Sequence, residues 1–474
     1  MTLAKPRMDG PENSRSGVDY RGQEFVLWLV RRVWWVAAIG DLGYTFAAME
    51  PLPVDVLQLQ RRDPVAWTAL LSRAPEMADV IVTAVMAEPL WDTALVLPGR
   101  ARAERARHMR RYVLTLDGSS DPITFIAKQT NAVEALLYHA LGEPPATGIV
   151  PCHYAHVDGD ASWVILEDVP DDFPPSVWQP AHVDAIIATL ARVHAAHWRK
   201  DITGIGAIPH FLHRPEGPYS WEALQGGRPT LFEDGAGAVL SRHAVRRAGR
   251  LAPLFLEAAN GLVALRDLGG WPGVLDESHL AAAADLLDDP VPLLATLDDL
   301  PWTLIHGAPH ADHWRLTLFE EQYLIDWSTA QHGPGVLDLI AFLERFPLLY
   351  ERLPEGGDEE EDGRPRVRLR EIAPLFEETA IDTYLLTLSA EMGQHFSARR
   401  FRAAVPAARC LHVLTTWFPF FARWSDNMPG KATWQRLNQL SEADLAQSRV
   451  GPMAGLRPYL AGVFDRFLHA YRSL

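Results

Sequence analysis

A run of polar residues between apolar segments marks the part of the chain best suited to chemistry. Residues 304–339 read LIHGAPHADHWRLTLFEEQYLIDWSTAQHGPGVLDL, which predicts a strand, a polar loop, a second strand, a turn and a third strand ending at Asp326. The loop carries His306, Asp312 and His313. Carboxylates can hydrogen-bond a nucleophile or bind a divalent cation, whereas an imidazole nitrogen suits zinc, manganese or iron better than magnesium. These residues are therefore candidates for a catalytic or cation-binding centre.

A lysine and a glutamate upstream form a second candidate constellation. Lys128 lies in a β-branched run (123–130), and Glu134 follows in a segment with helical periodicity (131–141). A helical carboxylate that pairs with a strand lysine fixes the ammonium, which then offers a point charge to phosphate groups. Lone strand lysines and helix glutamates are more often solvated surface residues. The order of the elements and the downstream loop favour the functional interpretation.

These segments resemble the aminoglycoside phosphotransferase and choline kinase-like family, part of the wider protein-kinase-like fold. The loop is similar to that family's pattern H-G-D-x-x-x-x-N, through His306 and Gly307. The third strand is similar to the family's metal-binding aspartate followed by an aromatic residue, through Asp326 and Trp327. The resemblance covers residue 91 to the end of the chain.

Two positions in the loop depart from the family pattern. Ala308 stands at the catalytic aspartate position, where a carboxylate accepts or orients the proton of a substrate hydroxyl, and alanine can do neither. His313 stands at the position of a metal-binding asparagine. The resemblance therefore implies that no catalytic residue is intact, that Asp326 and His313 bind the metal, and that Asp312 could substitute for the missing base.

The resemblance implies further roles outside the loop. Lys128 and Glu134 would hold the α- and β-phosphates of ATP. The strand at 162–167 would end in the hinge between two lobes, which places Leu166 and Asp168 at the nucleotide.

Other residues are expected to support the loop. His306 would brace it by hydrogen bonds, and Asp338 would support it without touching substrate. His194 and His197, on a predicted amphipathic helix (183–198), are expected to be structural.

The predicted elements give the fold class. Residues 112–118 and 123–130 predict a hairpin, 131–141 a helix, 149–157 and 162–167 two further strands, and 63–74 and 76–87 two helices before them. Together with the resemblance, this order indicates an α+β, bilobal, protein-kinase-like fold. It has a small antiparallel-sheet lobe, a large mostly helical lobe and a helical N-terminal extension. The turn that would cover the phosphates, 98–107, holds one glycine and four arginines, and that part of the pattern matches poorly.

The domain boundaries follow from these elements. We expect residues 1–20 to be disordered, 21–88 to form the N-terminal extension, 89–168 the sheet lobe and 169–474 the helical lobe, with the catalytic-type loop at 304–340. Residues 25–39 are apolar but too short to span a bilayer, so no transmembrane segment is expected. The tryptophan-rich stretch 21–50 could mediate self-association or contact a protein partner.

Composition restricts the class of protein. The formal net charge of −16 argues against nucleic-acid binding. The two cysteines, Cys152 and Cys410, form neither a disulfide framework nor a metal spacing, which favours a reducing, cytoplasmic location.

The first two functional interpretations share one fold. In the first, the protein transfers phosphoryl groups from ATP, with Mg²⁺ or Mn²⁺, to a small-molecule hydroxyl, and its activity is weakened or lost because Ala308 and His313 replace the usual residues. In the second it is a pseudokinase, a non-catalytic module that binds a nucleotide or a protein.

A third interpretation is a metal-dependent hydrolase using His310, Asp312 and His313, which form the second half of an H-x-H-x-D-H motif. Position 308 would have to be the first histidine of that motif, and it is alanine.

Overall fold

The computed structural model describes residues 56–73, 77–90, 109–141, 148–199, 208–214, 242–346, 369–425, 435–436, 438–441, 444 and 451–474. Three predictions lie outside these residues: the disorder of 1–20, the partner segment 21–50 and the arginine-rich turn 98–107.

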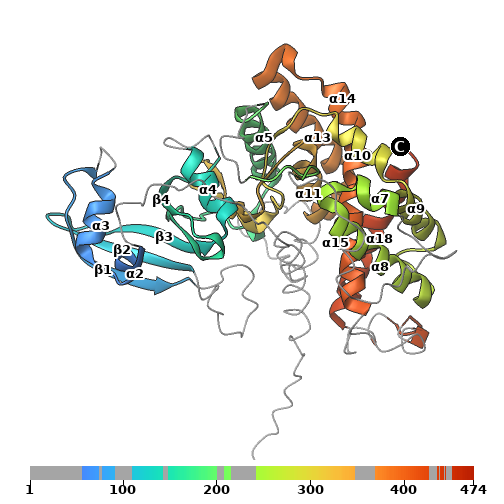
Figure 1. The fold of residues 1–474 in the computed structure, drawn as a ribbon, viewed down its shortest axis with the longest axis horizontal. Coiled ribbons are helices and arrows are strands. Elements are labelled where there is room, and N and C mark those ends of the chain that lie inside the picture. Colours follow the sequence, from blue (N-terminus) through green and yellow to red (C-terminus); the bar gives the residue numbers. More distant parts are fainter. Residues whose placement is uncertain are drawn as a thin grey trace, which may run out of the picture.

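The described residues form two lobes, a small one built on a sheet and a larger one built of helices, which Figure 1 shows side by side. The sheet lobe contains α2, α3 and β1–β5, and the helices from α5 onward make up most of the helical lobe. The predicted bilobal α+β arrangement is confirmed.

The small lobe is a five-stranded antiparallel sheet. Its strands, in the order β1-β2-β3-β5-β4, are β1 (Val82–Pro89), β2 (Met109–Leu116), β3 (Ile123–Thr130), β5 (Ser162–Glu167) and β4 (Cys152–His156). β3 and β5 have the predicted bounds. Their β-branched and aromatic residues favour a pleated surface, and turn residues bound them on both sides.

The side chains on the two faces of β3 contact different parts of the molecule. Phe125 and Ala127 are buried in a core with Trp67, which comes from helix α3 (Pro64–Leu71). Lys128 alternates with them and projects from the opposite face, toward helix α4 (Ala132–Leu141), where it contacts Glu134. The pleat of this strand therefore separates the packing side chains from the lysine.

The helix predicted over 76–87 is wrong. Residues 82–89 instead form β1, in which Val82 pairs with Leu116 and Val85 with Leu114 across β2. The segment VIVTAV is rich in β-branched residues, and pairing with β2 overrides the helical spacing of its apolar residues. The sheet itself consequently begins at Val82, seven residues before the sheet lobe expected from residue 89.

The predicted helix at 63–74 is confirmed as α3. Asp63 is its N-cap and accepts a hydrogen bond from the backbone N–H of Val65 at 3.0 Å. Proline occupies the first turn, where its missing N–H has no helical partner to lose. Helix α2 (Val56–Gln60) precedes it and buries Leu59.

The large lobe consists mainly of helices. They are α5 (Pro180–Ala196), α7 (Arg242–Arg247), α8 (Ala252–Leu268), α9 (Glu277–Asp288), α10 (Val291–Asp298), α11 (Val336–Arg345), α13 (Leu369–Met392), α14 (Ala398–Ala403), α15 (Val405–Ser425) and α18 (Gly451–Tyr471). Helices α8 and α15 approach closely at Gly261, where a Cβ would lie 1.9 Å from the carbonyl oxygen of Phe418. The aromatic residues Trp417, Phe418 and Phe420 are at most 2% exposed and belong to the core.

Short strands carry the polar loop between these helices. β6 (Thr303–Ile305) pairs with β9 (Gln331–Gly333), and β7 (Trp314–Leu316) pairs with β8 (Gln322–Leu324). The strand, loop, strand, turn and strand predicted before Asp326 are all present.

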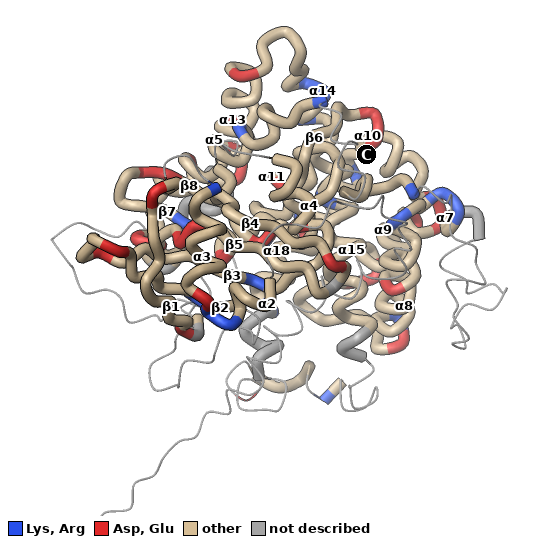
Figure 2. The backbone as a smooth tube through the Cα atoms, turned by 60° about the vertical axis from the view of Figure 1, so that its left-hand side comes forward, with Lys and Arg blue, Asp and Glu red and all other residues tan. Residues whose placement is uncertain are grey.

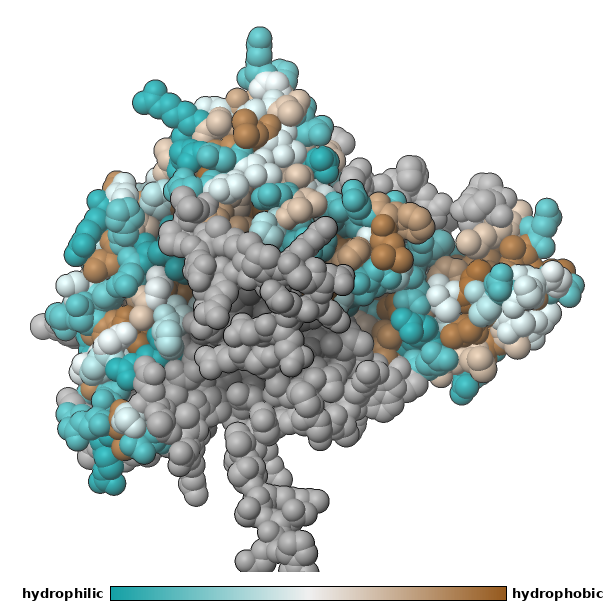
Figure 3. Space-filling view, turned by 180° about the vertical axis from the view of Figure 1, so that it is seen from behind, coloured by the Kyte–Doolittle hydropathy of each residue, from teal (hydrophilic) through white to brown (hydrophobic). Residues whose placement is uncertain are grey.

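The described surface is mixed in character. Figure 2 shows acidic positions on both lobes, in keeping with the net charge of −16. Figure 3 shows hydrophobic residues among hydrophilic ones on the sheet lobe, where Val65, Ile81 and Met86 are exposed. No helix in the described part of the chain is long and apolar enough to cross a membrane.

Candidate functional site

Lys128 is the point at which the two lobes meet. Its Nζ lies 2.7 Å from Oε2 of Glu134 on α4 and 2.6 Å from Oδ1 of Asp326, which follows β8 in the large lobe. The lysine side chain is 13% exposed. The structure therefore brings together the three charged residues that the sequence placed far apart.

Glu134 is fully buried and uses both carboxylate oxygens. Oε2 accepts from Lys128 and from the hydroxyl of Thr130, and Oε1 accepts the backbone N–H of Trp327 at 3.0 Å. Asn131 caps the helix by accepting the N–H of Glu134. One carboxylate thus connects a strand of the small lobe to the backbone of the large lobe.

Asp326 has a left-handed backbone, with φ of 67° and ψ of 61°. This conformation is uncommon for residues other than glycine, and it is found preferentially at functional sites. Oδ1 accepts from Lys128 and from the hydroxyl of Ser328 at 2.8 Å, whereas Oδ2 lies 3.4 Å from Nε2 of His313. The two oxygens therefore have different environments.

Charge pairing stabilises the ionised forms of both partners. Burial alone would lower the pKa of Lys128, but the carboxylates of Asp326 and Glu134 raise it above its usual value. Burial alone would raise the pKa of Asp326, but Lys128 holds it well below its usual range. Both groups are consequently charged across the ordinary pH range.

The loop before Asp326 is braced by a buried aspartate. Asp338 on α11 accepts the backbone N–H of His306 at 2.6 Å and that of Gly307 at 2.8 Å. His306 accepts the N–H of Ala308 on Nδ1 and donates from Nε2 to the carbonyl of Ile325 at 2.9 Å. These contacts fix the backbone of residues 306–308 against α11 and against the end of the third strand.

Gly307 is required at its position by two independent features. Its φ is +82°, and a Cβ would lie 2.5 Å from the carbonyl oxygen of Thr329. Both the left-handed backbone and the close approach exclude a side chain.

His194 lies behind Asp338 and is fully buried. Its Nε2 lies 3.2 Å from Oδ2 of Asp338, and its Nδ1 contacts the hydroxyl of Tyr384 on α13. His197 donates from Nδ1 to the carbonyl of Val193 at 2.9 Å. Helical periodicity predicted structural positions for both histidines, but nothing local indicated that His194 would reach Asp338.

Ala308 has no group that could exchange a proton with a substrate. The residue is 5% exposed, and its N–H donates to His306. Its carbonyl accepts from the N–H of His310 and from Nδ1 of His313, both at 2.8 Å. Its backbone is thus fully engaged within the loop.

The other two loop histidines are neutral. Burial lowers the pKa of His313 to about 3 and holds the pKa of His310 well below its usual range. Their rings lie against each other, with centroids 3.8 Å apart. Asp312 is half-buried beside them, and its backbone carbonyl accepts from Arg315.

The hinge candidates lie at the end of β5. Leu166 is 6% exposed and belongs to the main core. Asp168 pairs with Arg111 of β2, whose Nε is 2.6 Å from its Oδ2. Asp168 therefore tethers the sheet to the connection into the large lobe.

Several residues that connect the site were not predicted. Ser328 donates to Asp326, and its carbonyl accepts from the side-chain amide of Asn131 at 2.8 Å. Thr130 donates to Glu134. Asn131 stands at the start of the predicted helix 131–141, where asparagine favours an N-cap, but its second contact needs the packing of both lobes.

A cavity of about 450 Å³ lies on the other face of the sheet, away from Lys128. Ala127, Gln129 and Tyr112 are among its lining residues, and the pleat puts them opposite the lysine. It is therefore separate from the contacts between the lobes.

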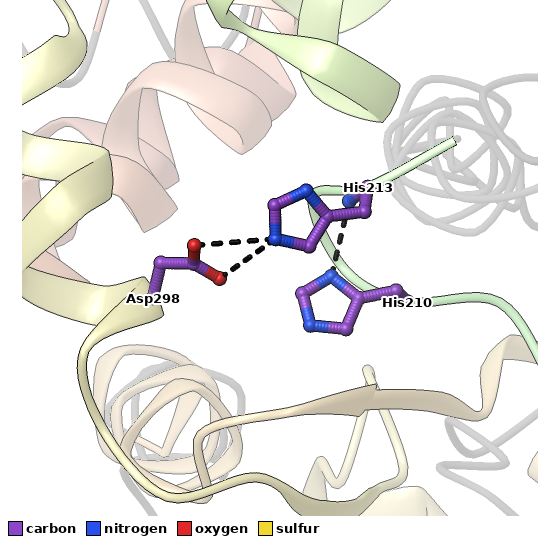
Figure 4. A group of neighbouring side chains, drawn as sticks. All are labelled: His210, His213 and Asp298. Atoms are coloured by element: carbon purple, nitrogen blue, oxygen red, sulfur yellow. Dashed lines mark hydrogen bonds and ion pairs between the residues drawn. The ribbon is translucent and has the colours of Figure 1, made fainter. Parts of the chain in front are cut away.

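One group of three side chains in the described ranges has metal-like spacing: His210, His213 and Asp298, drawn in Figure 4. Nε2 of His213 lies 3.1 and 3.2 Å from the oxygens of Asp298. Nδ1 of His210 already accepts the backbone N–H groups of Leu212 and His213. The Nδ1 lone pair of His210 is therefore already used in hydrogen bonds, so at most two side chains of this group remain available as metal ligands. His310, Asp312 and His313 do not form such a group within the described residues.

Comparisons with known proteins give matches among solved structures. No protein-family model and no curated protein matches the chain. Among solved structures, an aminoglycoside phosphotransferase from Alicyclobacillus acidocaldarius is 16% identical, covers 76% of this chain and 90% of its own, and has a TM-score of 0.37. A macrolide 2'-phosphotransferase from Brachybacterium faecium is 13% identical, with 76% and 99% covered and a TM-score of 0.32. A choline/ethanolamine kinase family protein from Mesorhizobium loti is 12% identical, with 76% and 89% covered and a TM-score of 0.35. Because TM-scores this low carry no functional conclusion, we infer function from the chain's own contacts.

Proposed function

We propose that the protein binds ATP between its lobes and that its site is of the small-molecule phosphotransferase type. Its transfer of a phosphoryl group to a hydroxyl compound is weakened or lost. The observation that carries this proposal is the contact of Lys128 with both Glu134 and Asp326. Two carboxylates from different elements hold one ammonium, an arrangement suited to presenting a positive charge to phosphates.

Each residue of this group has a distinct task. Glu134 fixes the position of Lys128 and stays buried beneath it. Lys128 binds phosphate oxygens as a point charge once it leaves Asp326. Asp326 would hold a divalent cation through Oδ2, since Lys128 and Ser328 donate to Oδ1, and the cation would neutralise charge on the phosphates. Leu166 and Asp168 line the nucleotide side of the hinge.

The hydroxyl of the acceptor has no carboxylate to receive its proton. A positioned base accelerates such steps by about 10²–10⁴-fold, and Ala308 contributes none of this. Positioning and electrostatics supply most of the rate of phosphoryl transfer, so a slow reaction remains compatible with the site. We propose that turnover is correspondingly low.

A non-catalytic role is favoured by one further observation. The backbone of Ala308 is engaged on both sides by His306, His310 and His313, so the loop is ordered without a catalytic carboxylate. A loop stabilised in this way suits a nucleotide-binding module. Turnover measurements separate this pseudokinase interpretation from slow catalysis.

Direct binding of ATP tests the proposal. Isothermal titration of the full chain with ATP, with and without a divalent cation, should show saturable binding. Lys128→Met keeps the bulk of the side chain and should weaken this binding at least about tenfold, since a hydrogen bond to a charged group contributes about 1.5–3 kcal/mol. Arg61→Met, at an exposed position after α2, is the matched control and should bind ATP normally. Absence of binding at millimolar ATP would reject the proposal.

A further inference from the structure

The cation site next to Lys128 has an unusual donor set. Its protein atoms are a carboxylate oxygen of Asp326 and an imidazole nitrogen of His313. Mg²⁺ takes oxygen ligands in near-ideal octahedral geometry, so a nitrogen at this point does not suit it. The magnesium implied by the resemblance therefore does not fit the residues present.

Hydrogen bonding determines which ring nitrogen of His313 is available. Nδ1 lies 2.8 Å from the carbonyl oxygen of Ala308. A carbonyl only accepts hydrogen bonds, so Nδ1 must carry the hydrogen. In the neutral ring Nε2 then has a lone pair, which faces Asp326.

Two electron-rich atoms consequently face each other. Nε2 of His313 lies 3.4 Å from Oδ2 of Asp326, which places the lone pair of the neutral imidazole against a carboxylate oxygen. Oδ1 of the same carboxylate is already occupied by Lys128 and Ser328, which leaves Oδ2 free of those donors. A shared cation would turn this repulsion into attraction.

The spacing agrees with ligation of a single ion. Two ligands at about 2.0–2.1 Å from a tetrahedral cation lie about 3.4 Å from each other. The carbonyl of Ala308 orients the imidazole in the manner typical of metal-binding histidines, and the ring of His310 packs on it.

We infer that this site selects a transition-metal cation such as Mn²⁺, Co²⁺ or Zn²⁺ over Mg²⁺, with His313 as the residue that determines the preference. The inference deepens the proposed function, on which it rests for the role of the bound cation. Imidazole ligands favour the later first-row metals, whereas carboxylate and water favour magnesium. Since the protein supplies two ligands, the remaining positions are open to water or phosphate oxygens, and the ion should exchange readily.

Cobalt binding tests this inference without nucleotide or turnover. Co²⁺ is titrated into the full chain and followed by its visible absorption, which reports nitrogen ligation, and Mg²⁺ is then added as a competitor. We expect saturable binding that equimolar Mg²⁺ does not displace. His313→Asn should weaken Co²⁺ binding at least about tenfold while Mg²⁺ affinity is retained.

The second histidine group supplies the matched control. His213→Ala removes the imidazole that faces Asp298 and should leave the Co²⁺ spectrum unchanged. Loss of the spectrum in His213→Ala, or unchanged Co²⁺ affinity in His313→Asn, would overturn the inference. If His313→Asn does not fold, competition on the natural chain decides, because displacement by equimolar Mg²⁺ also overturns it.

The outcomes for cation and nucleotide are distinguishable. Co²⁺ binding through His313 without ATP binding would reject the proposed function and keep the cation preference. ATP binding supported equally by Mg²⁺ and Co²⁺, and unchanged in His313→Asn, would keep the proposed function and reject the preference.

Discussion

Nζ of Lys128 lies 2.6 Å from Oδ1 of Asp326, although 198 positions separate the two residues in sequence. One comes from the sheet lobe and the other from a loop of the helical lobe. This contact, with the buried Glu134 beside it, joins the two lobes at the candidate site.

Removing the charge of Glu134 should weaken nucleotide binding. In Glu134→Gln the side chain keeps its shape, but Lys128 loses one of its two carboxylates and is held less firmly. We expect the ATP affinity to fall at least about tenfold, from the loss of a charged hydrogen bond of about 1.5–3 kcal/mol. Isothermal titration measures it. Glu88→Gln, an exposed carboxamide swap on β1, is the control, and an equal effect there would contradict the prediction.

Restoring a carboxylate at position 308 should raise turnover. Ala308→Asp places a base in the loop at the position that resembles the catalytic aspartate, and we expect ATP consumption with a hydroxyl acceptor to rise by up to about 10²–10⁴-fold. A coupled assay for ADP measures it across a panel of small alcohols and amino sugars. Activity gained in Ala308→Asp should disappear in the double variant with Lys128→Met. If it persists there, Lys128 does not serve the reaction.

Replacing Gly307 should reduce the stability of the protein more than replacing Gly118, which has a similar backbone angle. Gly307→Ala introduces a Cβ 2.5 Å from the carbonyl of Thr329, whereas at Gly118, with φ of +73°, nothing lies within 4 Å of the added atom. Gly118→Ala should therefore show only the backbone effect of about 1–2 kcal/mol, and Gly307→Ala should lose more. Urea unfolding of both variants gives the difference. Equal losses would mean that the loop relaxes around the new side chain.

The pH dependence of stability should contain a contribution from Glu344 in α11. This carboxylate is 1% exposed and accepts from Arg466 at 2.7 Å and from Arg409 at 2.6 Å. Burial alone would raise its pKa, but the two guanidiniums hold the pKa below its usual 4.5. Its stabilisation is therefore complete above that pH, and it is lost as the pH falls through the lower folded-state pKa.

The variant Glu344→Gln isolates this contribution. It should destabilise the protein by about 3–5 kcal/mol at neutral pH, because the buried Arg409 and the half-buried Arg466 lose a partner. The difference from the natural chain should shrink as the pH is lowered below 4.5, which urea unfolding at several pH values can follow. Glu378→Gln, at a side chain 68% exposed and paired with Arg402, should change stability by less than about 1 kcal/mol. A pH-independent difference for Glu344→Gln would count against the assignment.

Local signals in the sequence were sufficient for much of the fold. β3 and β5 have their predicted bounds because β-branched runs end at turn residues, and α3 begins where Asp63 and a proline indicate a helix start. The sequence of β1 predicts a helix because the spacing of its apolar residues fits the helical period as well as the strand period. Pairing with β2 decided between them.

The candidate site likewise has a part that the sequence predicts and a part that it does not. Residue types and the resemblance are enough to predict the charged residues Lys128, Glu134 and Asp326. The contacts that support them depend on tertiary packing. No local pattern shows that His194 reaches Asp338 or that Ser328 accepts from Asn131, since each pair joins different elements.

The pairing of the Lys128 ammonium with Asp326 also means that a phosphate competes with this carboxylate for the lysine. A phosphate that approaches Lys128 must displace the carboxylate oxygen of Asp326, which lies 2.6 Å from Nζ. A nucleotide without a cation is therefore repelled by the negative charge of Asp326 as well as attracted by Lys128. Withdrawing that anion, as in Asp326→Asn, should therefore strengthen binding of nucleotide in the presence of a chelator, which calorimetry would detect. On the proposed function, Asp326 should therefore make ATP bind more tightly with a divalent cation than without one.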